Sequence, residues 1–221
     1  MNIAIDGPAG AGKSTIARKA AAKLGSVYVD TGAMYRAMAL LVIREGIDPE
    51  DQEALEACAA KAEISIEYRD GEQHILLGAE DVGGLIRNED VSRMASRISA
   101  NAAVRRKLVS LQQELAKRTD VVMDGRDIGT VVLPDAEVKV YLTASSRIRA
   151  ERRRKEYLDK GEEAPELSEL IRDIEERDFR DMHREESPLK RAEDAVLIDS
   201  SFMTIEEVAD AILSLVPGEE A

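Results

Sequence analysis

The sequence has little of the residue types that build disulfides and zinc sites. Its 221 residues include one cysteine, Cys58, and two histidines, His74 and His183. One cysteine excludes an internal disulfide, and the three residues offer no pair at the spacing that zinc ligands need. Because Cys58 lies in an alanine-rich helical stretch, we interpret it as an inert, partly buried thiol rather than a reactive one.

Long apolar runs are also missing. The sequence has no run of about 18 apolar residues, the length that a membrane-spanning helix needs. Its first residues, MNIAIDG, lack the basic region and apolar stretch of a secretory signal. We therefore expect a cytoplasmic protein that does not bind membranes.

Positive charge is the scarcer sign, with 31 lysines and arginines against 44 acidic residues and a net charge of −13. Such a chain repels nucleic acid unless its cations are concentrated locally, so we expect no nucleic-acid partner. The acidity is strongest in residues 41–90 and 192–221, which carry −10 and −8. Residues 147–191 instead combine 13 basic with 14 acidic side chains. This pattern is typical of a solvated helical surface, or of a mobile arm that reaches a phosphate.

What the sequence does contain is a regular alternation of strand and helix signals. Five short, almost continuously apolar segments are typical of buried parallel strands. They are Asn2–Asp6, Ser26–Asp30, Val121–Asp124, Val138–Leu142 and Ala195–Asp199. Stretches with helical periodicity alternate with them, at Lys13–Leu24, Ala33–Arg44, Arg147–Lys160 and Thr204–Leu215. The alternation predicts an α/β fold, a five-stranded parallel sheet flanked by helices. Thr204 with Glu207 predicts a capping box that opens the final helix.

Residues 64–86 break this alternation. ISIEY alternates apolar and polar residues, Asp70 and Gly71 favour a tight turn, and HILL continues the apolar pattern, which together predict a hairpin. Helical stretches flank it at Pro49–Ala62 and Asn88–Lys117. We interpret this region as an inserted subdomain with a small antiparallel sheet.

The most specific motif is GPAGAGKS, which matches the phosphate-loop pattern G-x-x-x-x-G-K-[ST] between a predicted strand and a predicted helix. Its glycines let successive N–H groups turn toward a phosphate, and the helix N-terminus adds its positive dipole end. Lys13 can reach the β- and γ-phosphates, and the Ser14 hydroxyl suits Mg²⁺. The motif predicts that a nucleoside triphosphate binds to Gly7, Pro8, Ala9, Gly10, Ala11, Gly12, Lys13, Ser14 and Thr15.

This motif predicts nucleotide binding but not the reaction. The guanine-reading motif N-K-x-D is absent from the sequence. A carboxylate near Mg²⁺ is expected at the end of a neighbouring strand, and Asp124 is the preferred candidate. Asp30 also ends a predicted strand and competes with Asp124 on sequence alone.

Arginines and carboxylates gather in three further clusters. DTGAMYR (30–36) and DGRDIGT (124–130) begin at the carboxyl ends of predicted strands, where parallel sheets bind ligands. In these clusters, Arg36 and Arg126 each offer a planar fork to a phosphate. In the third cluster, Arg177, Asp181 and Arg184 share one helix face, a spacing that suits either a ligand site or an exposed ion-pair ladder.

Taken together, IDGPAGAGKST, VDTGAMYR, DGRDIGTVVLPDA, LTASSRIRAERR and ERDFRDMHREESPL closely resemble the bacterial cytidylate kinases, a family of nucleoside monophosphate kinases. The resemblance covers nearly the whole chain. It implies a P-loop NTPase-type fold in one domain, 1–221, with a monophosphate-binding region at 31–105. It also implies that the insertion spans about 62–98 and that a helical, arginine-rich lid spans 147–191.

The resemblance implies a reaction as well: transfer of the γ-phosphoryl group of ATP, with Mg²⁺ as cofactor, to CMP or dCMP. The implied CMP-binding residues are Thr31, Tyr35, Arg36, Ser96, Arg105, Gly125, Arg126, Asp127, Arg177, Asp181 and Arg184. Ser96, Arg105 and Asp127 would read the cytosine. Asp127 would accept from the exocyclic amine and Arg105 would donate to N3 and O2, a pairing that uracil does not offer.

Charge on the transferring group would be neutralised by Lys13, Arg126, Arg152 and Arg153, together with Mg²⁺ bound at Ser14 and Asp124. The sequence does not separate Arg152 and Arg153 from their neighbours Arg149 and Arg154.

Two alternatives remain open at this point. One is a P-loop kinase for another acceptor, such as UMP, AMP, dTMP or shikimate. The other is a nucleotide-dependent switch, which would not need a second arginine-rich site. The resemblance also implies a monomer.

Overall fold

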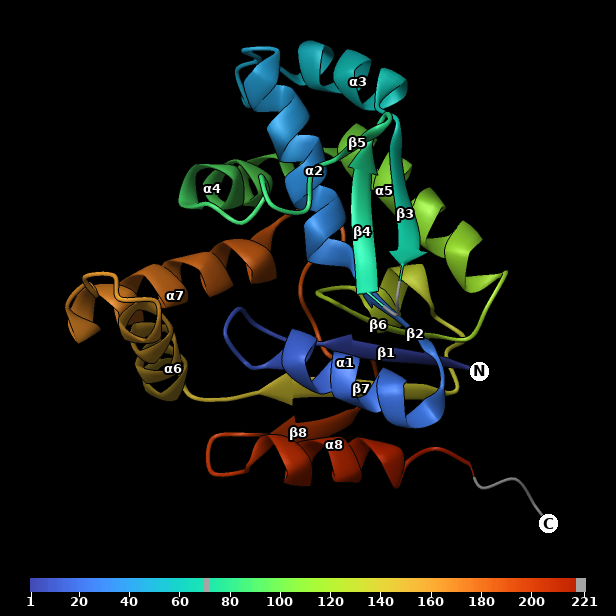
Figure 1. The fold of residues 1–221 in the computed structure, drawn as a ribbon, viewed down its shortest axis with the longest axis vertical. Coiled ribbons are helices and arrows are strands. Elements are labelled where there is room, and N and C mark those ends of the chain that lie inside the picture. The colour runs from blue at the N-terminus through green and yellow to red at the C-terminus, as the bar shows by residue number, and fades with distance from the viewer. Residues whose placement is uncertain (70–71, 218–221) are drawn as a thin grey trace. The chain divides into compact units, whose positions relative to one another are not determined.

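The computed structural model describes residues 1–69 and 72–217 (Figure 1). The chain divides into two compact units. The first unit is Met1–Tyr28 with Asp120–Ala221, and the second is Val29–Thr119. The predicted turn at Asp70 and Gly71 lies outside the described residues.

The main sheet has five strands in the order β2-β6-β1-β7-β8. These strands are β1 (Asn2–Asp6), β2 (Val27–Asp30), β6 (Val121–Gly125), β7 (Val138–Thr143) and β8 (Val196–Asp199). The central strand β1 pairs in parallel with β6 and β7, and β7 pairs in parallel with β8. The five predicted strands are therefore confirmed, each to within one residue at either end. As the apolar pattern predicts, Ile3 and Ile5 of β1 are fully buried.

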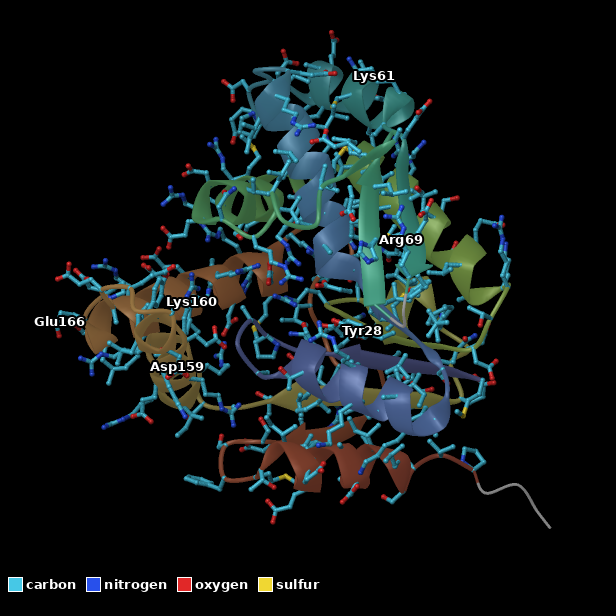
Figure 2. All side chains as sticks on the ribbon, in the orientation of Figure 1. Tyr28, Lys61, Arg69, Asp159, Lys160 and Glu166 are labelled. Atoms are coloured by element: carbon cyan, nitrogen blue, oxygen red, sulfur yellow. The ribbon has the colours of Figure 1, made fainter. Side chains whose placement is uncertain are left out.

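Helices of the first unit form two groups. Helices α1 (Lys13–Leu24) and α8 (Ile205–Leu213) contact each other, and Ile16 and Ile212 join the core of the sheet. Helices α6 (Ser146–Asp159) and α7 (Leu167–His183) pack together around Ala150, Leu170 and Ile174. Figure 2 labels the exposed residues Asp159, Lys160 and Glu166 at the end of this helix pair.

The second unit combines four more helices and a small sheet. Its elements are α2 (Thr31–Arg44), α3 (Gln52–Lys61), β3 (Ile64–Arg69), β4 (Glu72–Leu77), β5 (Glu80–Asp81), α4 (Glu89–Ile98) and α5 (Ala102–Ala116). Strands β3 and β4 pair in antiparallel register, which confirms the predicted hairpin, and β5 extends the sheet. The unit has its own core, which includes Met38, Leu55, Ile98 and Leu108.

The predicted helical stretch Asn88–Lys117 is wrong as one continuous element, because the structure divides it into α4 and α5. The Asn101 side chain accepts from the Val104 N–H at 3.0 Å and so caps a new helix. An asparagine that bonds the backbone locally competes with helix continuation, and here it starts α5 instead.

Two smaller predictions are tested directly by the structure. Thr204 and Glu207 form the predicted capping box at the start of α8. Cys58 is buried, and burial raises the pKa of its thiol, which agrees with an inert role. Among the described residues, no helix is both long and apolar enough to cross a membrane.

Candidate functional site

The phosphate loop connects β1 to α1. Gly7 has φ 149°, and a Cβ there would lie 1.9 Å from the Leu142 carbonyl oxygen of the adjacent strand β7. Gly12 is the residue before α1 and adopts a left-handed conformation with φ 90°. Both positions therefore require glycine, one for close backbone approach and one for a positive φ. The backbone conformation thus explains why the motif at residues 7–14 has glycine at positions 7 and 12.

Lys13 points back into this loop and is 6% exposed. Its Nζ donates to the Pro8 carbonyl oxygen at 2.7 Å. The pKa of Lys13 is lowered to about 7, mainly by burial and also by the nearby Arg126 and Arg177, while Asp124 and Asp6 act to raise it. A bound phosphate would offer this ammonium a stronger partner than a neutral carbonyl.

Ser14 and Asp124 meet directly at the start of α1. The Ser14 hydroxyl donates to Oδ2 of Asp124 at 2.9 Å, and the Tyr28 hydroxyl donates to Oδ1 at 3.0 Å. Figure 2 labels Tyr28 next to α1. The pair offers hard oxygen ligands, which fits Mg²⁺. Among the described residues no cluster of three or more His, Cys, Asp or Glu suits a metal.

Asp30, the competing metal candidate, has a different environment. Its side chain accepts from the Ala33 N–H at 2.9 Å and so caps α2, and it pairs with Arg36 at 3.0 Å. Both carboxylate oxygens therefore have local partners within the second unit. The contact with Ser14 favours Asp124 instead.

A second loop of the first unit follows β6. It forms one π-helical turn, Ile128–Val132, whose first N–H groups point at a buried carboxylate. Asp6, at the end of β1, accepts from the Ile128 and Gly129 N–H groups, each at 2.8 Å. The pKa of Asp6 is raised to about 6, mainly by burial and also by the nearby Asp127. The hydrogen bonds from the two N–H groups act in the opposite direction and lower it. Sequence reasoning missed Asp6, whose only signal is its position directly before Gly7.

Two partly buried ion pairs join this loop to the end of α7. Arg126 Nε donates to Asp181 Oδ2 at 2.8 Å, and Arg184 Nη2 lies 3.5 Å from Asp127 Oδ1. Burial acts to raise the pKa of Asp181, but its pair with Arg126 outweighs burial and holds that pKa below its usual value. Arg177 lies one turn before Asp181 and lowers that pKa further. The predicted residues of this cluster thus lie together, rather than forming an exposed ladder.

The second unit collects the remaining acceptor candidates. Thr31 is buried at the start of α2, and Arg36 is held by Asp30. Arg105 is buried, with its guanidinium 5.7 Å from the centre of the Tyr35 ring and Nη1 bonded to the Ser99 carbonyl at 3.1 Å. Ser96 lies on α4, partly exposed. These residues lie on α2, α4 and α5 of one compact unit.

Gln73 of β4 is a residue that sequence reasoning missed. Its Oε1 accepts from the Asp30 N–H at 2.8 Å, and its Nε2 donates to the Asp30 carbonyl at 3.5 Å. The small sheet therefore holds the start of α2 in place, next to Thr31. No local sequence signal links positions 43 residues apart.

The basic run of α6 approaches the phosphate loop from within the first unit. Arg152 Nη2 donates to the Ser200 carbonyl at 2.6 Å, and Nη1 lies 3.2 Å from the Ser200 hydroxyl and 3.5 Å from the Ala11 carbonyl. Arg149 donates to the Ala9 carbonyl. Arg153 is partly exposed on the same helix, and Arg154 is exposed. The loop after β8 thus lies beside the phosphate loop.

Comparisons with known proteins agree with these motifs. The family model described as cytidylate kinase matches residues 3–218. A cytidylate kinase of Desulforamulus reducens is 52% identical over 97% of this chain and 96% of its own length. A cytidylate kinase of Caldicellulosiruptor saccharolyticus is 50% identical over 97% of this chain and 95% of its own. The crystal structure of a shikimate kinase from Bacteroides thetaiotaomicron, 14% identical, covers 98% of both chains with a TM-score of 0.51, a likeness of fold.

Proposed function

The chain belongs to the cytidylate kinase family, and on that premise we propose that it transfers the γ-phosphoryl group of ATP to CMP or dCMP. The products are ADP and CDP or dCDP. The observation that carries the proposal is the pairing of Arg126 with Asp181 and of Arg184 with Asp127, in the same unit as the phosphate loop. A nucleotide switch has no use for this second group of arginines, whereas a kinase needs cations to bind the phosphate of its acceptor.

The nucleophile is a phosphate oxygen of CMP, which is already ionised at neutral pH. The chain therefore needs no strong general base, and catalysis consists of positioning and charge stabilisation. Lys13 would leave the Pro8 carbonyl for the β- and γ-phosphates, and Arg126, Arg152 and Arg153 would stabilise charge on the transferring group. Ser14 and Asp124 would hold Mg²⁺, whose chemistry is to neutralise charge on the phosphate oxygens.

The proposed CMP ligands follow the resemblance. Thr31, Tyr35 and Arg36 would contact the nucleotide and its phosphate. Further contacts would come from Gly125, Arg126, Arg177, Asp181 and Arg184. The ion pairs of Arg36 with Asp30 and of Arg126 with Asp181 hold both arginine side chains in place, which reduces the entropy lost when a phosphate binds.

Base selection would depend on Asp127, Arg105 and Ser96. Asp127 would accept from the cytosine amine, and Arg105 would donate to N3 and O2 of the ring. Uracil presents an N–H at N3 and a carbonyl at C4, so it would leave both side chains poorly paired. An unpaired buried polar group costs about 1–3 kcal/mol, which corresponds to a tenfold to hundredfold preference for cytosine.

The resemblance supports three further parts of the proposal. The whole chain, 1–221, would act as one kinase domain, in which 31–105 binds the monophosphate and 62–98 is its inserted part. Residues 147–191 would act as the lid that excludes water during transfer. The protein would work as a cytoplasmic monomer with ATP and CMP as its partners.

The direct test uses the purified protein with ATP, Mg²⁺ and CMP, and separates the products by ion-exchange chromatography. We expect equal amounts of ADP and CDP, with CDP formation dependent on all three components. Binding of ATP without any CDP formation would instead favour a nucleotide-dependent switch.

A further inference from the structure

We propose that Arg149 is a positioning residue that fixes the phosphate loop and ties helix α7 to it. The inference rests on the proposed role of that loop in binding ATP. Arg149 belongs to the basic run of α6, yet it is only 5% exposed. Arg147 and Arg154, on the same helix, are exposed. Burial of one arginine among exposed ones indicates a specific internal role for it.

The guanidinium of Arg149 joins three separate segments through three donors. Nη1 donates to the Ala9 carbonyl in the phosphate loop at 2.9 Å. Nε donates to the Ala144 carbonyl, just after β7, at 2.9 Å. Nη2 pairs with Oδ2 of Asp178 on α7 at 2.6 Å. A planar fork with donors in fixed directions can reach all three, whereas the single ammonium of lysine cannot.

The bond to Ala9 sets the direction of an N–H group in the loop. In a trans peptide the carbonyl of one residue and the N–H of the next lie in one plane and point in opposite directions. By holding the Ala9 carbonyl, Arg149 therefore directs the Gly10 N–H away from α6. The Ser200 hydroxyl, 3.3 Å from the Ala11 carbonyl, does the same for the Gly12 N–H. Loops of this kind bind phosphate through inward-facing N–H groups.

Close packing at Gly10 gives independent support for a tight fit. A Cβ at Gly10 would lie 3.3 Å from Cβ of Arg149, which is tighter than most side-chain contacts, and Gly10 has φ 76°. The backbone of the phosphate loop thus lies against the stem of Arg149, while its guanidinium bonds the adjacent residue.

Asp178 extends the connection from the phosphate loop to helix α7. It supplies the negative charge that a buried guanidinium needs, since an unpaired buried charge is strongly destabilising. One turn further along α7, Asp181 bonds Arg126 in the loop after β6. Helix α7 is therefore connected through Asp178 and Arg149 to the phosphate loop, and through Asp181 to Arg126 in the loop after β6. The position of one loop depends on the other through this helix.

The test measures ADP binding to the full-length protein by isothermal titration calorimetry, with Mg²⁺ and without CMP. The variants are Arg149→Lys, which keeps the charge and the aliphatic stem, and Arg149→Met, which removes the charge. We expect ADP to bind roughly tenfold more weakly to Arg149→Lys and still more weakly to Arg149→Met. Arg147→Met is the matched control, because Arg147 is exposed and pairs with Glu151 on its own helix. It should bind ADP as the wild type does.

Asp178→Asn and the double variant Asp178→Asn with Arg149→Met test the link to α7. Asp178→Asn should weaken ADP binding less than Arg149→Met does, and the double variant no more than Arg149→Met alone. Urea unfolding of each variant shows whether it folds, and ADP binding is compared only among the variants that do. If Arg149→Met does not fold, Arg149→Lys decides.

Three results separate the possibilities. Wild-type ADP affinity in folded Arg149→Lys and Arg149→Met would overturn the inference and leave the proposed function intact. An equal loss in Arg147→Met would also overturn it, since the effect would then reflect net charge alone. Failure of the wild type to bind ADP would contradict the proposed nucleotide function itself. In steady-state assays the KM for ATP should rise in the Arg149 variants by a larger factor than kcat falls.

Discussion

The Ser14 hydroxyl donates to Oδ2 of Asp124 at 2.9 Å, although 110 residues separate the two in the sequence. Ser14 lies in the first turn of helix α1, and Asp124 lies near the end of strand β6. Their contact joins the loop that would hold ATP to residues 124–127, at the end of β6. It also brings two hard oxygen ligands together, which favours Asp124 over Asp30 as the partner of Mg²⁺.

Replacing Asp124 should therefore change the response to Mg²⁺. We expect Asp124→Asn to lower kcat about 10²-fold and to raise the Mg²⁺ concentration that gives half-maximal rate, because the amide loses the negative charge. Titrating Mg²⁺ at fixed ATP and CMP measures both quantities. Asp135→Asn is the control, since Asp135 is exposed. An unchanged Mg²⁺ response in Asp124→Asn would assign the metal elsewhere.

Lys13 should matter for turnover and not for folding. Its Nζ is buried against a carbonyl, and burial lowers its pKa to about 7, so the charged form gains nothing from this environment. We expect Lys13→Met to reduce kcat by about 10²-fold or more while the free energy of unfolding in urea does not fall, because methionine avoids the cost of burying a charge. A large loss of stability with preserved kcat would show that Lys13 is a structural residue.

Asp127 should discriminate between pyrimidines. Asp127→Ala is expected to lower kcat/KM for CMP by tenfold to hundredfold, and to lower the value for UMP much less, because uracil has no amine to donate. Kinetics with both nucleotides give the ratio, and Glu185→Gln, an exposed change in the loop after α7, is the control. Equal losses for CMP and UMP would indicate that Asp127 acts only through its contact with Arg184.

Asp6 should make stability depend on pH. Its pKa is about 6 in the folded protein and near 3.8 when unfolded, so the folded state binds the proton more tightly. This contribution to stability is complete below about pH 4 and is lost as pH rises toward 6, by up to roughly 3 kcal/mol. Urea unfolding of the wild type and Asp6→Asn between pH 4 and 7 measures it. The wild type should lose stability relative to the variant over that range, and a constant difference would contradict the raised pKa.

The sequence predicted the strands, the hairpin and the phosphate loop because each depends on local pattern. Apolar runs mark the buried strands, and the glycine spacing at residues 7–12 reflects backbone angles that few other residues adopt. The boundary between α4 and α5 was missed, because the helical signals on both sides of Asn101 outweighed its capping tendency.

Contacts between distant residues could not be predicted in the same way. Asp6 bonds N–H groups that lie 122 and 123 residues away, and Gln73 bonds Asp30 across 43 residues. Arg149 and Arg147 have the same side chain two positions apart, so composition alone cannot tell which is buried. Which arginine is buried depends on the side of helix α6 that it occupies and on where the phosphate loop lies, and both are properties of the folded chain.

A comparison of acceptors tests the proposed cytidylate kinase activity most directly. The purified protein is assayed with ATP and Mg²⁺ on CMP, dCMP, UMP, AMP and dTMP, and kcat/KM is measured for each. A cytidylate kinase should give the highest values for CMP or dCMP, with UMP at least about tenfold lower. UMP, AMP or dTMP as the best acceptor would contradict it.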